Sequence, residues 1–384
     1  MFPKLRFKKF DGDWTAVTLE SLAEVERGKF SVRPRNDPRY FGGEMPFIQT
    51  GDVTGSDVYL KGYTQTLNDD GIRVSKVFPA DTILITIAAN IGDTTITQYP
   101  VACPDSVVAI QPKQDKVNTI FLKNVIDLQK DNLDSQATQN AQKNINLQVL
   151  KPLKLIVPSK EEQNKIASFL SAVDEKISQL TQKLELLSQY KQGMMQKLFS
   201  QQVRFKADDG SEFGEWGNSY IGDVCKITTG NKDTQNKVDD GEYPFFVRSQ
   251  TVERINSYSM DCEAVLTSGD GVGVGKNYHY IDGKFDFHQR VYCLFDFSEN
   301  ILGKYLYIYF SSYFYDRVKR LSAKNSVDSV RMDMISKMEI QLPCLEEQTK
   351  IANFLSSIDQ KIEVVGQQIE QAKQWKKGLL QQMF

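Results

Sequence analysis

The hydrophobic pattern is most regular in two segments, residues 158–199 and 343–384, where apolar side chains recur at alternating spacings of four and three. This heptad pattern is typical of a long helix whose apolar seam packs against another helix. At a rise of 1.5 Å per residue, each segment predicts a rod of about 60 Å. The first seam comprises Ile166, Leu170, Val173, Ile177, Leu180, Leu184 and Leu187, and the second comprises Ile351, Leu355, Ile358, Ile362, Val365 and Ile369.

The two helical segments are copies of one sequence. At an offset of 185 residues, 20 of their 42 positions are identical, which indicates an internal duplication. Lys191 and Lys376 occupy the same place in the two seams. Parallel, in-register packing would set these like charges in one apolar layer, whereas antiparallel packing separates them. The pattern therefore favours an antiparallel coiled coil within one chain.

The remaining regions predict mixed α/β domains. Residues 77–96, 262–276 and 284–297 are rich in β-branched and aromatic side chains, as strands are. Residues 301–320 predict a buried helix with Tyr305, Tyr309 and Tyr313 on one face, although these rings could also stack on bases. We therefore expect an α+β (mixed α/β) chain with a pseudo-twofold repeat. Its segments are a variable domain at 1–157, a spacer helix at 158–199, a second variable domain at 200–342 and a second helix at 343–384.

Composition and charge narrow the class of protein. The chain of 384 residues has a net charge of −2, and the four segments carry +1, +1, −4 and 0. This balance disfavours nucleic-acid binding through bulk positive charge, so any contact with DNA should come from local patches. The two His and five Cys include no CxxC pair, which argues against a zinc site or a disulfide framework. Without a long apolar run or a signal-peptide core near residue 1, we expect a cytoplasmic protein.

Tests for catalytic motifs are negative. Residues 37–40 read Asp-Pro-Arg-Tyr and lack the second proline of an amine-methyltransferase motif. The glycine-rich run 269–276 fails the phosphate-loop pattern, because Asp270 replaces the first glycine and Asn277 replaces the Ser or Thr. We interpret this run as a tight turn between strands. We assign no catalytic residue and no metal ligand, and we expect a binding protein.

Candidate DNA contacts cluster in short polar stretches. Residues 27–39 hold five basic side chains in an exposed loop, which suits phosphate contacts and arginine readout of guanine, although a plain solvated loop is also possible. The matching stretches elsewhere are rich in amides, which can bond adenine. The candidates are Arg27, Lys29, Ser31, Arg33, Arg35, Gln139, Asn140 and Lys143 in the first domain, and Asn231, Lys232, Arg248, Gln250, Lys276, Lys324 and Asn325 in the second.

The duplicated segment carries a family resemblance. Each copy reads Pro-x-x-Glu-Glu-Gln-x-Lys-Ile-Ala-x-Phe-Leu-Ser, followed by Asp-x-Lys-Ile. This motif, repeated at the correct spacing, resembles the conserved regions of type I restriction–modification specificity subunits. The resemblance implies two target recognition domains that each read one half of a bipartite, asymmetric DNA site. It also implies that the two conserved helices pack antiparallel and space the domains.

The same resemblance implies partners for the chain. Two methyltransferase subunits would dock on the helices and carry S-adenosylmethionine, and a restriction subunit that uses ATP and Mg would join them. The specificity subunit itself would be non-catalytic and bind no cofactor. On the outer helix faces, the candidates for partner contacts are Glu162, Gln163, Lys165, Asp174, Lys176, Glu347, Gln348, Lys350, Asp359 and Lys361. The alternative function is a protein–protein scaffold that does not recognise DNA.

Overall fold

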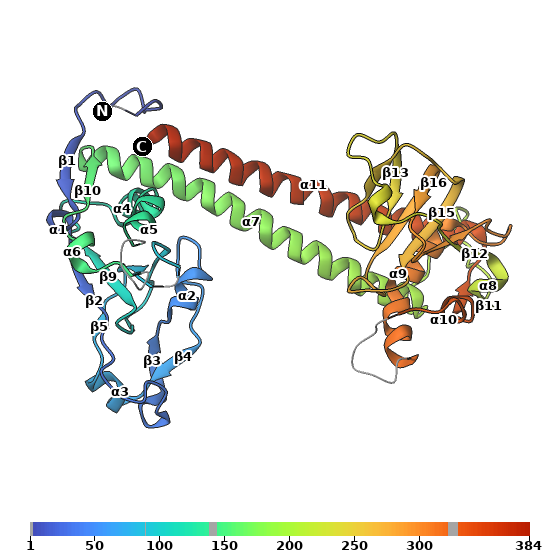
Figure 1. Cartoon of the computed structure of the whole chain (residues 1–384), viewed down its shortest axis with the longest axis horizontal. Helices are drawn as coiled ribbons and strands as arrows, with labels where there is room; N and C mark the ends of the chain where they lie inside the picture. The colour runs from blue at the N-terminus through green and yellow to red at the C-terminus, as the bar shows by residue number, and fades with distance from the viewer. Residues whose placement is uncertain (1–2, 89, 138–143, 322–328) are drawn as a thin grey trace. The chain divides into compact units, whose positions relative to one another are not determined.

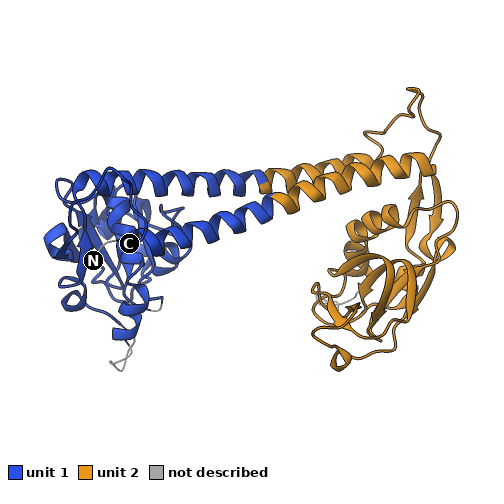
Figure 2. Cartoon of the chain, turned by 90° about the horizontal axis from the view of Figure 1, so that it is seen from above, with its two compact units in different colours: residues 1–183, 365–384 blue, residues 184–364 orange. Residues whose placement is uncertain are grey.

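The computed structural model describes residues 3–88, 90–137, 144–321 and 329–384, which form two compact units. Unit 1 comprises Met1–Lys183 and Val365–Phe384, and unit 2 comprises Leu184–Val364. Each unit therefore combines one variable domain with a part of both long helices (Figures 1 and 2). Both units mix helices and strands, which confirms the expected fold class.

Unit 1 contains small sheets that helices flank. The strands pair in the orders β2-β9-β6-β7, β4-β3-β8-β5 and β1-β10. Its core includes the apolar strand β6, whose four residues are all buried because both faces of the strand are covered. The elements are β1 (Thr15–Thr18), α1 (Leu19–Leu22), β2 (Ala23–Arg27), the 3-10 helix η1 (Pro38–Tyr40), β3 (Phe41–Phe47), α2 (Thr50–Thr54), β4 (Gln65–Leu67), α3 (Asp69–Arg73), β5 (Val77–Phe78), β6 (Ile83–Thr86), β7 (Thr94–Ile96), β8 (Val101–Ala102), β9 (Val107–Pro112), α4 (Thr119–Asp127), α5 (Lys130–Ala137), α6 (Leu147–Leu150), β10 (Lys154–Val157) and the start of α7 (Lys160–Phe199).

Unit 2 is built around a larger sheet. Six strands pair in the order β12-β17-β15-β16-β13-β14, and β11 pairs with β18. The neighbours are antiparallel except for β13 and β16, which run parallel. The elements are β11 (Gly217–Tyr220), α8 (Ile221–Val224), β12 (Lys226–Thr229), the 3-10 helix η2 (Thr234–Asn236), β13 (Tyr243–Phe246), β14 (Glu253–Ile255), β15 (Met260–Ser268), β16 (Tyr278–Phe287), β17 (Val291–Phe295), α9 (Gly303–Leu321), α10 (Met332–Ser336), β18 (Glu339–Leu342) and the start of α11 (Leu345–Met383).

Helix α9 is a core helix of unit 2. Phe199, at the end of α7, packs edge-on against the rings of Tyr305, Tyr309 and Tyr313, at centroid distances of 6.0, 5.3 and 5.6 Å. Tyr305 is fully buried, and its hydroxyl donates to the carbonyl of Gln341 at 2.7 Å. The prediction of a buried helix is therefore confirmed, and this aromatic face is not a stacking platform for bases.

The long helices pack antiparallel within each unit. In unit 1, Asp174 of α7 pairs with Lys376 of α11 at 2.5 Å, and Phe169 packs on Trp375. In unit 2, Lys191 pairs with Asp359, also at 2.5 Å, while Phe354 packs on Tyr190. The residues of unit 2 are the repeat counterparts of those of unit 1, because the sequence numbers of the equivalent residues on α7 and α11 differ by 185. The seam side chains are all buried or half-buried, and each seam lysine meets an aspartate instead of the other lysine.

The segment before each domain is clamped to its helix in the same way. Arg6 forms a bidentate ion pair with Glu162, with both N···O distances at 2.8 Å. Arg204 holds Glu347 in unit 2, through Nε at 3.0 Å and Nη2 at 2.7 Å. Glu162 and Glu347 are almost fully buried, so these charges need their arginine partners. The clamp therefore fixes each domain to one long helix.

Candidate nucleic-acid interface

In unit 1, three segments from distant parts of the sequence meet at one edge, which we call edge 1. They are the loop 28–37 after β2, the residues that follow β3, and the turn 103–106 between β8 and β9. Gly28 is required here, because a Cβ atom would lie 2.3 Å from the carbonyl oxygen of Pro104. Arg35 reaches across to Asp105 at 2.9 Å, and Arg27 donates to the Asp105 carbonyl. The basic loop is therefore held against the sheet.

Unit 2 repeats this arrangement at edge 2. The loop 230–237 after β12 packs on the turn 288–290 between β16 and β17. A Cβ atom on Gly230 would lie 2.0 Å from the carbonyl oxygen of Phe287. Asp233 accepts a hydrogen bond from Gln289 at 3.3 Å, and Lys232 lies 3.7 Å from the buried carboxylate of Asp286. The same edge thus exists in both units with different side chains on it.

Edge 1 is hollowed by a cavity of about 330 Å³. Phe30 and Phe47 contribute buried aromatic surface to it, and polar side chains line the rest. The amide of Gln49 donates to the amide oxygen of Gln65 at 3.0 Å. This bond uses the oxygen of the Gln65 amide and leaves its nitrogen as a potential donor. The polar lining comprises Arg35, Asn36, Gln49, Thr64, Gln65 and Ser106.

The sequence-predicted residues of the first loop all lie on edge 1. Arg27, Lys29, Ser31, Arg33 and Arg35 are exposed. Arg33 donates to the neighbouring carbonyl of Val32 at 2.8 Å, so its guanidinium stays at the surface. The sequence did not reveal Gln49 or Gln65, because they approach this loop only through the sheet.

In unit 2, the predicted residues spread over edge 2 and the adjoining turn. Asn231, Arg248, Gln250 and Lys276 are exposed, and Lys232 is half-buried. The ammonium of Lys276 lies over the ring of Tyr315, 5.6 Å from its centroid. As expected, residues 269–276 form a turn between strands β15 and β16. The candidates Gln139, Asn140, Lys143, Lys324 and Asn325 lie outside the described residues.

Four of the predicted partner contacts do not lie on outer helix faces. Glu162, Gln163, Glu347 and Gln348 are at most 1% exposed. The amide oxygen of Gln163 accepts from the backbone of Asn118 at 3.0 Å, and that of Gln348 accepts from Leu302 at 2.9 Å. The prediction of outward positions is wrong for these four, because the first turn of each helix is covered by its own domain.

The other predicted partner contacts remain at the surface to different degrees. Lys165, Lys176 and Lys361 are exposed. Lys350 is half-buried and pairs with Asp208 at 2.5 Å. Asp174 and Asp359 are half-buried and are used in the pairs between the long helices.

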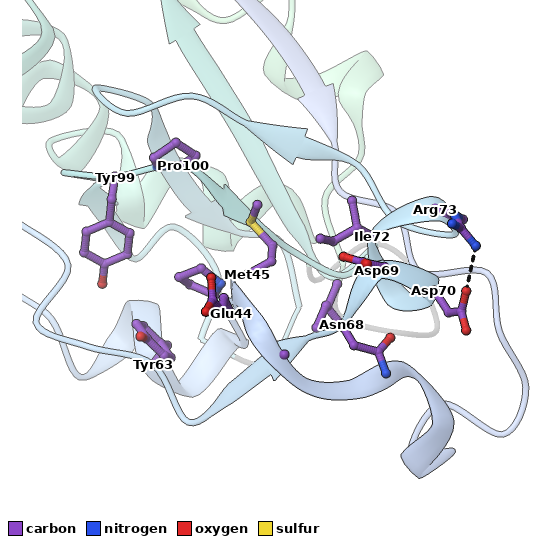
Figure 3. Close-up of a pocket in the computed structure, with 13 residues that line it drawn as sticks. Glu44, Met45, Tyr63, Asn68, Asp69, Asp70, Ile72, Arg73, Tyr99 and Pro100 are labelled. Atoms are coloured by element: carbon purple, nitrogen blue, oxygen red, sulfur yellow. Dashed lines mark hydrogen bonds and ion pairs between the residues drawn. The ribbon is translucent and has the colours of Figure 1, made fainter.

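Another cavity of unit 1, of about 1030 Å³, lies between β3, β4 and α3 (Figure 3). Tyr63 and Tyr99 border one side of it, and Asp69 and Asp70 border the other. With Glu44, three carboxylates face a single arginine, Arg73, which already pairs with Asp70 at 2.9 Å. This excess of negative charge would repel phosphate, so we do not place DNA here.

Several buried titratable side chains in the described parts of the units have shifted pKa values. Burial lowers the pKa of His279 and of His288 from the ordinary value of 6.5, which favours the neutral imidazoles in the folded unit. Burial also raises the pKa of the Cys103 thiol to about 12. Within the described ranges, no group of three or more His, Cys, Asp or Glu could hold a metal ion. The helices in those ranges include none with the length and apolar character needed to cross a membrane.

The duplicated arrangement of domain, helix and edge matches a known family. Residues 11–189 and 214–374 fit the family model described as "Type I restriction modification DNA specificity domain". The chain belongs to this family. It therefore acts in DNA recognition, as a type I specificity subunit.

Two relatives support this membership, one along nearly the whole length of the chain and one along part of it. The chain is 26% identical to the type I restriction enzyme MjaVIII specificity subunit of Methanocaldococcus jannaschii, over 97% of this chain and 94% of the relative. It is 31% identical to the EcoDI specificity subunit of Escherichia coli, over 42% of this chain and 35% of the relative. The fold is similar to the crystal structure of the type I S subunit from M. genitalium, with a TM-score of 0.69, 16% identity and coverage of 100% and 99% of the two chains.

Proposed function

We propose that each unit of this specificity subunit reads one half of a bipartite DNA target through its edge. The observation that carries the proposal is that one edge occurs in both units with different side chains on it. Two equivalent edges with different side chains can recognise two different half-sites, which together form an asymmetric target. The geometry of the protein then sets the separation of the half-sites. The exposed cations supply phosphate contacts, and the amide and guanidinium groups supply contacts to bases.

DNA binding by the complex with the methyltransferase subunit tests this proposal. The double variant Arg33→Ala, Arg35→Ala should weaken binding in fluorescence anisotropy and reduce the salt dependence by up to about one unit of slope per lost phosphate contact. Arg73→Ala is the matched control, because it removes an exposed arginine beside the acidic cavity. Unchanged affinity in the double variant would refute the assignment to edge 1. Binding that is absent or insensitive to salt in the wild-type complex would favour the alternative function, a protein scaffold.

We also propose that the long helices dock two copies of a methyltransferase subunit. Trp375 is 54% exposed in unit 1, and Tyr190, at the corresponding position of unit 2, is 52% exposed. Each ring is held edge-on by a phenylalanine of the other helix, at 6.1 and 6.4 Å between centroids. Rigid Trp and Tyr side chains are the usual anchors of protein interfaces. Two matched anchors on one chain support two copies of the same partner.

The stoichiometry of the complex tests this docking surface. Trp375→Ala and Tyr190→Ala should each lower the number of bound methyltransferase subunits from two to one, as measured by mass photometry. Gln374→Ala changes a neighbouring exposed residue and should leave two subunits bound. Retention of both subunits in the double aromatic variant would contradict the proposal.

In this account the chain supplies recognition while its partners supply the chemistry. S-adenosylmethionine belongs to the methyltransferase subunits, ATP and Mg belong to the restriction subunit, and the complex acts in the cytoplasm. Binding of radiolabelled S-adenosylmethionine by the chain alone would contradict it.

A further inference from the structure

The glycine-rich turn of unit 2, residues 269–277, contacts two arginines from two other segments of the chain. Arg248 lies two residues beyond β13, and Arg290 lies in the turn between β16 and β17. The carboxylate of Asp270 accepts from Nη1 of Arg248 at 3.0 Å, and its other oxygen lies 3.7 Å from Nε of Arg290. Two remote cations thus converge on one carboxylate.

The same turn also fixes the backbone of both arginines. The amide of Gly269 donates to the carbonyl of Arg290 at 2.7 Å. The side-chain amide of Asn277 donates to the carbonyl of Arg248 at 3.2 Å. Gly273 is required beside this bond, because a Cβ atom there would lie 2.0 Å from the Asn277 amide nitrogen. Gly269 and Gly273 therefore allow close packing against the arginine segments, whereas Gly271 and Gly275 adopt positive φ angles of 79° and 65° in the turn.

The two arginines differ in how firmly they are held. The side chain of Arg248 is 44% exposed, and that of Arg290 is 66% exposed and further from the carboxylate. Among the described residues, Asp270 is the only side chain that bonds the Arg248 guanidinium, so its Nε and Nη2 donors remain available at the surface. The pair and its carboxylate carry a net charge of +1, which favours an approaching DNA strand.

We propose that Arg248 reads a guanine in the half-site of unit 2, that Asp270 is its positioning residue, and that Arg290 contacts a backbone phosphate. The major-groove edge of guanine offers O6 and N7 as adjacent acceptors, which match two parallel N–H donors of one guanidinium. A carboxylate bonded to one nitrogen restricts the rotation of the planar group and leaves the remaining donors oriented outward. This inference rests on the proposed function and adds the identity of one base.

Mapping of methylated adenines by the complex with its methyltransferase subunit tests the inference. Arg248→Lys keeps the positive charge but cannot donate two parallel bonds, so discrimination at one position of one half-site should fall about ten- to a hundredfold. Asp270→Asn should reduce the same discrimination without changing the other half-site. Arg73→Lys, the matched control, should keep the guanine preference because Arg73 borders the acidic cavity of unit 1, where we place no DNA.

The outcomes separate the inference from the proposed function. A guanine that becomes variable in Arg248→Lys, but stays fixed in Arg73→Lys, supports the assignment. A guanine that stays fixed in Arg248→Lys, or a half-site pair without guanine, overturns it while leaving the two-part target intact. A wild-type complex that methylates DNA without sequence preference would instead overturn the proposed function. Because Arg248 is exposed, the folded state of its variant can be verified by an unchanged melting temperature.

Discussion

At the scale of residues, buried polar groups join each domain to its long helix. Glu347 accepts bonds from Arg204 and also from the indole nitrogen of Trp216 at 3.0 Å. Glu162 is the counterpart in unit 1, but the Trp14 indole nitrogen is buried without a bonding partner among the described residues. The two clamps therefore use the same Arg–Glu ion pair, but the hydrogen bond from the tryptophan indole to the carboxylate is present only in unit 2.

This difference predicts unequal effects of neutralising the two carboxylates. Glu347→Gln should lower the melting temperature of the chain by several degrees, and Glu162→Gln should lower it less, because only Glu347 also bonds an indole, that of the half-buried Trp216. Differential scanning calorimetry measures both changes under identical conditions. An equal or larger effect of Glu162→Gln would contradict the account of the clamps.

The two histidines predict acid sensitivity that is confined to unit 2. Burial holds the pKa of His279 and of His288 below the ordinary value of 6.5. The unfolded chain then binds more protons than the folded unit as the pH falls below about 6.5, so the histidines favour unfolding there. When the pH is lowered from about 7.5 to about 5.5, the free energy of unfolding of unit 2 should therefore fall. This decrease should be larger in the wild-type chain than in the double variant His279→Gln, His288→Gln. Equal pH dependence of the two proteins in calorimetry would contradict this prediction.

Some residue positions could be predicted from the sequence and others could not. The seam was predictable because heptad spacing is a local property of one helix. The burial of Gln163 and Gln348 was not, because it depends on backbone donors at Asn118 and Leu302 in the domains. The contact of Gln49 with Gln65 also depends on strand pairing, which one-dimensional spacing does not encode. The basic loop was visible as a cluster, but its anchoring to Asp105 was not.

At the scale of elements, the antiparallel order of the long helices follows from the charged positions in the seam. Each lysine that would face another lysine in a parallel pair meets an aspartate, Asp359 for Lys191 and Asp174 for Lys376. Lysine can place its methylene groups along the apolar seam while its ammonium reaches the carboxylate. These pairs therefore help to select the antiparallel order, and the apolar seam supplies most of the stability.

A charge swap tests this role of the seam pairs. Lys376→Asp should destabilise unit 1, because it places two carboxylates together, and the addition of Asp174→Lys should restore much of the loss. The coupling energy in a double-mutant cycle should be about 0.5–3 kcal/mol, as for residues in direct contact. Urea denaturation of the four proteins measures it. A coupling energy near zero would show that the pair does not contribute to helix pairing.

At the scale of the whole molecule, the end of each long helix contacts the segment that leads into a domain, and we call these two contacts the junctions. The amide of Leu5 donates to the carbonyl of Gln382 at 2.8 Å within unit 1. In unit 2, the amide of Val203 donates to the carbonyl of Lys197 at 3.2 Å, where the chain is continuous. Gln382 and Lys197 are equivalent positions of the repeat, because their numbers differ by 185. The segment near residue 5 thus meets the end of α11 as residue 203 meets the end of α7.

This equivalence predicts that the chain tolerates circular permutation. A permutant that joins Phe384 to Pro3 through a short flexible linker and begins at Gln202 should keep both junction contacts and all strand pairings. It should assemble with the methyltransferase subunit and yield the same methylated sequence as the original chain. A second permutant, opened inside β15, serves as the control and should fail to fold. Loss of assembly in the first permutant would contradict the equivalence of the junctions.

The central claim is that two unlike edges of one chain read the two halves of one DNA target. Mapping of every methylated adenine that the wild-type complex produces tests this claim most directly. The account predicts two short, different sequence elements separated by a fixed number of unspecified bases, with Arg33→Ala, Arg35→Ala relaxing only one of them. A single uninterrupted element, or relaxation of both halves by that variant, would contradict the account.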